Sequence, residues 1–219
     1  MQMKMWTLAV GSLLAATLAG AADAPAPVTS ELASQKLRRV PKATHHLKLY
    51  AHTFRGTRWN NDEILTAVVE AAGLLAQCDI AVTGIELRVI EAPQRFHYYY
   101  TPVSRELLRH FTTPKPALFF VEDTKNNPAF DAEAIGLANA KTRPELAMTV
   151  WVAYGARDLS RALAHELVHV LSDSGDHTDE PGNLMRAETS PSQHRLTAAQ
   201  CDLMRSRGET NGLLKRLSS

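Results

Sequence analysis

The most informative stretch of this chain is residues 158–174, which read DLSRALAHELVHVLSDS. Its large apolar side chains recur at three- and four-residue steps, at Leu159, Leu163, Leu167, Val170 and Leu171. That spacing matches the 3.6 residues per turn of an α-helix. The pattern therefore predicts a helix that buries this stripe in a core and presents His165 and His169 on its opposite side.

Within this helix, residues 165–169 form the pattern H-E-x-x-H. His165 and His169 lie one turn apart, so both imidazoles can reach one zinc ion at about 2.0–2.1 Å. Glu166 lies about 100° further around the helix, where it can hold a metal-bound water rather than ligate the ion. The structural alternative is two surface histidines with an ordinary glutamate between them.

A catalytic zinc site needs a third protein ligand and one position for water. We predict His177 as that ligand, because Gly175 can adopt the left-handed conformation that ends a helix and turns the chain back. The alternative ligands are Asp176, Asp179 and Glu188. Glu188 lies at a distance used when a second helix supplies the third ligand.

Together with residues 183–185, Asn-Leu-Met, these residues resemble the metzincin clan of zinc endopeptidases. In that clan one helix supplies two histidines and a base glutamate, a glycine turn leads to a third histidine, and a methionine-containing turn lies under the metal. The resemblance assigns Met185 to the Met-turn, which is compatible with Met185 simply filling a gap in the core. It also implies an upstream helix and a mostly parallel sheet with one antiparallel edge strand.

The chain departs from the clan pattern H-E-x-x-H-x-x-G-x-x-H at two points. Ser172 stands where the glycine is usual, and Gly175 follows three residues later. The predicted third ligand, His177, comes eight residues after His169 rather than six. Among metzincins the chain would therefore be an outlying member.

Alternating or continuous apolar runs predict strands, and three- and four-residue repeats predict helices. The expected strands are 47–51, 84–91, 117–121 and 147–152, and the expected helices are 60–77, 103–111, 158–174 and 197–206. Residues 98–100 and 124–134 are expected in loops. With the resemblance, the fold class is α+β: a mixed, mostly parallel twisted sheet with an antiparallel edge strand, packed on the upstream helix and the active-site helix. Substrate is expected along the edge, at 117–121 or 136–139.

The N-terminus has the features of a signal peptide over residues 1–21. Lys4 precedes an apolar stretch, residues 6–18, which is too short for a membrane span, and residues 19–21 read Ala-Gly-Ala. Cleavage after Ala22 or Ala24 is the alternative. We expect a secreted or periplasmic protein without a membrane anchor after cleavage. A flexible N-terminal segment, 22–44, would precede one catalytic domain, 45–219.

Removal of residues 1–21 takes away one lysine and no acidic residue, which leaves 23 basic and 23 acidic side chains. A neutral chain argues against nucleic acid and against a charged membrane surface as partner. In an exported protein, Cys78 and Cys201 are expected to form a disulfide, with two buried thiols as the alternative.

These features predict a monomeric, exported zinc endopeptidase that acts on proteins or peptides, with Glu166 as general base. No tyrosine follows Met185; Tyr98, Tyr99, Tyr100 and His194 are candidate oxyanion stabilisers, and none is assigned. The alternatives are a non-catalytic binding module stapled by zinc, a gluzincin-like peptidase that uses Glu188, and an adhesin or inhibitor on a peptidase scaffold. The remaining histidines are not expected to bind metal; they are His45, His46, His52, His97 and His110.

Overall fold

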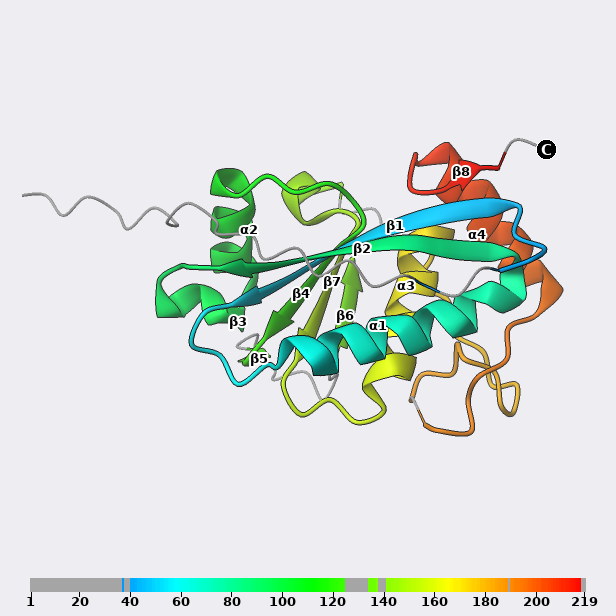
Figure 1. Cartoon of the computed structure of the whole chain (residues 1–219), viewed down its shortest axis with the longest axis horizontal. Coiled ribbons are helices and arrows are strands. Elements are labelled where there is room, and N and C mark those ends of the chain that lie inside the picture. The colour runs from blue at the N-terminus through cyan, green and yellow to red at the C-terminus, as the bar shows by residue number, and fades with distance from the viewer. Residues whose placement is uncertain (1–36, 38–39, 125–133, 138–140, 189, 218–219) are drawn as a thin grey trace, which may run out of the picture.

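The structure, a computed structural model, describes residues 37, 40–124, 134–137, 141–188 and 190–217 (Figure 1). The signal peptide expected at 1–21 lies outside the described residues, as does most of the segment 22–44. Among the described residues, no helix has both the length and the apolar character that a membrane crossing requires.

The main sheet has the strand order β2-β1-β4-β7-β6. Its parallel strands are β1 (His45–Phe54), β2 (Ile80–Ile90), β4 (Ala117–Val121) and β7 (Thr149–Ala153). At one edge, β6 (Ala134–Leu137) runs antiparallel to β7, and a short strand, β8 (Lys215–Arg216), pairs antiparallel with the start of β1. The predicted α+β class, with a mostly parallel sheet and an antiparallel edge strand, is confirmed.

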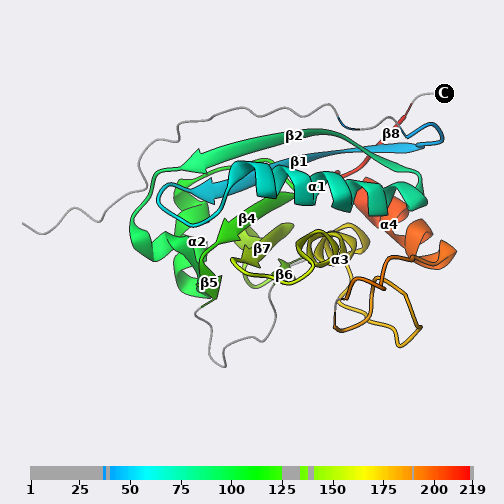
Figure 2. The same ribbon diagram turned by 60° about the horizontal axis from the view of Figure 1, so that its bottom comes forward.

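Helices cover both faces of this sheet. The helices α1 (Asn61–Leu75), α3 (Leu159–Ser172) and α4 (Ala198–Thr210) share one hydrophobic core with one face, and α2 (Thr101–His110) packs against the other. Strand β4 contributes alternately to the two cores: Leu118 and Phe120 face α1 and α3, whereas Phe119 lies on the α2 side. Figures 1 and 2 show α3 beside α1 and α4.

Most expected elements occur with ends shifted by a few residues, some longer and some shorter than their local patterns. The cap of α1 is Asn60, whose side chain accepts a hydrogen bond from the backbone N–H of Asp62. Residues 98–99, expected in a loop, instead form strand β3 (Tyr98–Tyr99), which pairs with β5 (Asp123–Thr124).

The prediction that residues 117–121 form a sheet edge is wrong. All five side chains of β4 are buried, and the strand lies between β1 and β7. A strand covered on both faces and paired on both sides reads as a continuous apolar run, and that run does not distinguish centre from edge. The antiparallel edge is β6, which contains residues 136 and 137 of the other candidate; residues 138–139 lie outside the described residues.

Cys78 and Cys201 form a disulfide, with their Cα atoms 4.9 Å apart. Cys78 ends the short 3-10 helix η1 (Ala76–Cys78) that follows α1, and Cys201 lies in the first turn of α4. The bridge therefore ties α4 to the end of α1.

Candidate metal centre

Helix α3 positions two of the predicted ligands. Its apolar stripe is anchored by Leu163, Leu167 and Leu171, which are fully buried against the helices and the sheet. His165 and His169 are themselves 4% and 7% exposed, because the chain that follows α3 folds back over them. The helix thus fixes the backbone of both histidines, and the returning chain fixes their rings.

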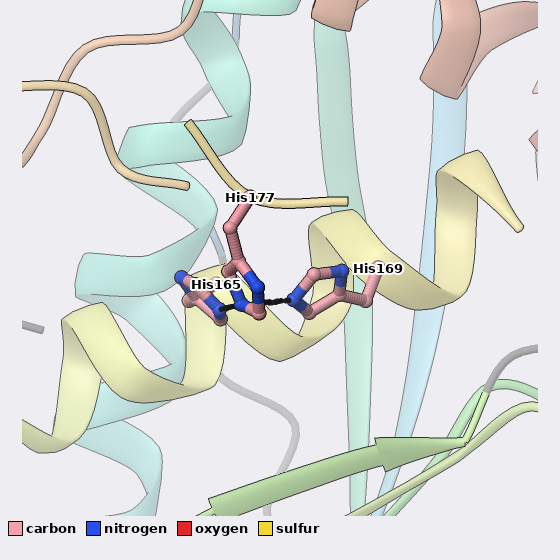
Figure 3. Close-up of side chains that lie close together, drawn as sticks. All are labelled: His165, His169 and His177. Atoms are coloured by element: carbon pink, nitrogen blue, oxygen red, sulfur yellow. Dashed lines mark hydrogen bonds between the residues drawn. The ribbon is translucent and has the colours of Figure 1, made fainter. Parts of the chain in front are cut away.

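The third predicted ligand joins them from that returning chain (Figure 3). The Nε2 atoms of His165 and His169 lie 3.0 Å apart, and each lies 3.2 Å from Nε2 of His177. Within the described ranges, these three residues form the one group of His, Cys, Asp or Glu side chains placed to share a metal ion. The alternative ligands are exposed and lie outside this group; they are Asp176, Asp179 and Glu188.

Hydrogen bonds at Nδ1 determine which ring nitrogen of His165 and of His169 carries the proton. Nδ1 of His165 donates to the carbonyl oxygen of Leu184 at 2.8 Å, and Nδ1 of His169 donates to that of Ser174 at 2.7 Å. Because each carbonyl oxygen can only accept, Nδ1 carries the proton in the neutral ring, and Nε2 presents a lone pair. Two such lone pairs 3.0 Å apart cannot bond to each other, and a cation among them would relieve their repulsion.

The donor set fits a zinc-like ion. A tetrahedral ion with Zn–N bonds of 2.0–2.1 Å separates its ligand nitrogens by about 3.3 Å, close to the spacing of the three Nε2 atoms. Burial lowers the pKa of His165 from 6.5 to about 4, and burial also lowers the pKa of His169. Both rings are therefore neutral near pH 7, the form that metal binding requires.

Glu166 lies against the edge strand. Its carboxylate accepts a hydrogen bond from the backbone N–H of Gly136 on β6, and a Cβ built on Gly136 would lie 2.5 Å from Glu166 Oε2. Burial raises the pKa of Glu166 to about 7, although the hydrogen bond from Gly136 acts in the opposite direction. The carboxylate is thus held between α3 and the edge of the sheet, one residue along the chain from His165.

Gly136 is a site residue that the sequence did not predict; its pattern indicated only a possible edge strand at 136–139. The available signal was an isolated glycine between apolar residues, a pattern typical of close backbone approach in a strand. Its partner, Glu166, lies far away in sequence, so no local pattern connects the two residues.

The turn that ends α3 differs from the prediction. Asp173, rather than Gly175, adopts the left-handed conformation, with φ 50°, and its N–H bonds to the carbonyl oxygen of His169. Aspartate is among the few non-glycine residues that tolerate this region. The chain therefore leaves the helix two residues earlier than expected and still brings His177 over the other two histidines.

The buried Met185 belongs to a turn that touches two of the ligand segments. The carbonyl oxygen of Leu184 accepts from His165, and the carbonyl oxygen of Met185 accepts from the N–H of Thr178, next to His177. The turn at residues 183–185 is thus bonded directly to two segments of the candidate metal centre.

The other weighed residues lie elsewhere. Tyr99 packs on Trp151 in the α2-side core, and His194 is exposed. His52 is buried with its Nε2 2.8 Å from Thr113 Oγ1. None of the five histidines set aside as non-ligands belongs to the metal group in the described part of the chain.

No protein-family model matches the chain, and no curated protein matches its sequence. The arrangement of residues at the site therefore carries the functional argument.

Proposed function

We propose that this protein is an exported, zinc-dependent endopeptidase of the metzincin type. In this proposal His165, His169 and His177 hold the ion, Glu166 is the general base and Met185 is the Met-turn residue. The observation that carries the proposal is the convergence of three Nε2 atoms beside a partly buried glutamate that faces the edge of a sheet.

When bound by the three histidines, zinc would supply Lewis-acid chemistry, lowering the pKa of a water to about 7. Glu166 then accepts a proton from the attacking water and delivers it to the leaving amine. Without a cation, burial raises the pKa of this carboxyl group to about 7. A cation close to Glu166 would lower this pKa and favour the base form.

The proposed substrate is an extended segment of protein or peptide on the free side of β6. Among the described strands, β6 pairs with β7 alone, and the N–H of Gly136 is bonded to Glu166; the proposal places the peptide strand beside the remaining backbone groups of β6. Gly136 joins this strand to Glu166, which would bring a bound peptide near the general base. The antiparallel edge strand and the upstream helix α1 are also features that the metzincin resemblance implies.

The rival functions agree less well with the site. A structural zinc site usually has four protein ligands, and within the described residues no fourth His, Cys, Asp or Glu joins the three histidines. A gluzincin-like site would need Glu188, which is exposed and outside the group. A non-catalytic site also has no need of a partly buried glutamate beside the first ligand.

The direct test is cleavage of a denatured protein and of quenched fluorescent peptides by the zinc-loaded chain. We expect cleavage that 1,10-phenanthroline abolishes and added zinc restores. Glu166→Gln should keep one zinc per chain by elemental analysis and lose turnover by at least 100-fold, the usual order for general acid–base catalysis. A chain that holds zinc and cleaves none of these substrates, or a Glu166→Gln variant as active as the wild type, would refute the assignment.

A further inference from the structure

The turn at residues 183–185 is a shared support for the metal ligands. Through Leu184 it holds the ring of His165, and through Met185 it holds the backbone at Thr178, next to His177. A displacement of this turn would therefore misplace two of the three ligands. What fixes the turn should then influence how tightly the centre binds metal.

Asn183 fixes the turn from inside the protein. Its side chain is 1% exposed, and its Oδ1 accepts a hydrogen bond from the backbone N–H of Met185 at 2.9 Å. The same amide makes two reciprocal hydrogen bonds with the side-chain amide of Gln200. Asn183 Nδ2 donates to Gln200 Oε1 at 3.1 Å, and Gln200 Nε2 donates to Asn183 Oδ1 at 3.2 Å.

Gln200 reaches the turn from another element, the first turn of α4. It also completes the capping box of that helix: its Oε1 accepts from the N–H of Thr197, and its own N–H donates to Thr197 Oγ1. One side chain therefore both caps α4 and fastens the metal-site turn. The next residue, Cys201, forms the disulfide with Cys78, so the first turn of α4, which carries Gln200, is covalently joined to the short helix that follows α1.

We propose that Gln200 is a positioning residue for the metal centre, acting through Asn183 on the turn that orients His165 and the segment of His177. Its hydrogen bonds go to Thr197 and Asn183 rather than to the three ligands. Its effect is on metal affinity, so this inference depends on the three-histidine site and not on peptidase activity. The competing explanation is that Gln200 only caps α4.

Gln200→Glu separates these two roles. The sequence T-x-x-E is the standard capping box, so a glutamate keeps the acceptor for Thr197 and preserves the cap. It cannot donate to Asn183 Oδ1, and it brings a carboxylate oxygen against that carbonyl oxygen. A capping role thus predicts unchanged metal affinity, whereas the positioning role predicts a loss.

The measurement is the zinc dissociation constant of the full chain, by competition with a chromophoric chelator. We expect Gln200→Glu to weaken zinc binding by 10- to 100-fold, the range typical of outer-shell partners, and to change the visible spectrum of the cobalt-substituted protein. Gln193→Glu is the matched control, because Gln193 Oε1 accepts from the N–H of Ser190 in the same connecting loop, a bond that a glutamate oxygen can keep. It should change zinc affinity less than threefold.

A double-mutant comparison tests the route through Asn183. In an Asn183→Ala background, Gln200→Glu should change zinc affinity by less than twofold, because its partner is already absent. Equal zinc affinity in the wild type and Gln200→Glu would overturn the inference, as would a full effect of Gln200→Glu in the Asn183→Ala background. If the zinc affinities change as expected but the wild type cleaves no peptide, that result would count against the proposed function and not against this inference.

Discussion

Under the proposed function, replacing Gly136 of β6 with alanine should displace the Glu166 carboxylate, lower activity and leave zinc binding intact. The added Cβ would lie 2.5 Å from Glu166 Oε2, 3.0 Å from the Glu166 carbonyl oxygen and 3.3 Å from Glu166 Cβ. Ordinary contact begins at 3.4 Å, so the carboxylate must retreat by about 0.9 Å. The Glu166 carbonyl oxygen and Cβ are fixed by the backbone of α3 and cannot move by a side-chain rotation. Strand β6 and helix α3 must therefore also separate slightly.

Two magnitudes follow from this geometry. Overpacking of this kind costs about 1–3 kcal/mol of folding stability. A displacement of about 1 Å at a catalytic group can cost roughly 100-fold in rate, which corresponds to about 2.7 kcal/mol of activation free energy. The three atoms nearest to the added Cβ all belong to Glu166 and none to an imidazole, so zinc content should remain one ion per chain.

The assay compares kcat/KM on a quenched fluorescent peptide, zinc content and thermal unfolding for Gly136→Ala and for a control, Gly84→Ala. In the control, the new Cβ on β2 meets one atom within 4 Å, Lys48 Cγ at 3.8 Å, so the same change in strand propensity occurs without a clash. Cleavage by Gly136→Ala within threefold of the control would refute the claim that the edge strand holds Glu166 in place.

Further predictions concern the disulfide, a buried histidine and the ligand set. Cys78→Ser with Cys201→Ser should lower the free energy of unfolding in urea by up to about 5 kcal/mol, because the bridge closes a sequence separation of 123 residues; an unchanged urea midpoint would argue against the bridge. Burial, with nearby positive charges, lowers the pKa of His52 from 6.5 to about 3. The fold keeps His52 neutral, and this has no cost above pH 6.5. As the pH falls from 6.5 towards 3, the unfolded chain binds a proton that the folded chain does not, so the free energy of unfolding falls, by about 2 kcal/mol at pH 5. His52→Phe should flatten the dependence of unfolding free energy on pH between 7 and 5, and an identical slope would contradict this. His177→Ala should lose zinc by elemental analysis, whereas Glu188→Ala should keep it; the reverse result would support a gluzincin-like site.

The local part of the metal centre was predictable because it depends on a single helix. The period of Leu163, Leu167 and Leu171 indicates which side is buried, and the four-residue spacing places His165 and His169 together on one side. Neither inference needs knowledge of the rest of the chain. The helix boundaries were less accurate, since the left-handed turn occurs at Asp173 instead of Gly175.

The sheet was predictable in its class but not in its order. A continuous apolar run such as residues 117–121 indicates a buried strand, yet its neighbours are chosen by how the helices cross over the sheet. The structure places that run at the centre and leaves β6 at the edge. The candidate substrate edge could therefore be assigned only from the assembled sheet.

By itself, the sequence determined that one amphipathic helix carries two histidines and a glutamate at metal-site spacing, because helical geometry acts over a few residues. Tertiary structure alone decided that His177 completes the group in preference to Asp176, Asp179 or Glu188. It also decided that Gly136 meets Glu166 and that Gln200 reaches Asn183. These contacts join segments that are distant in sequence, and their geometry depends on how the sheet, α3 and α4 pack around one core.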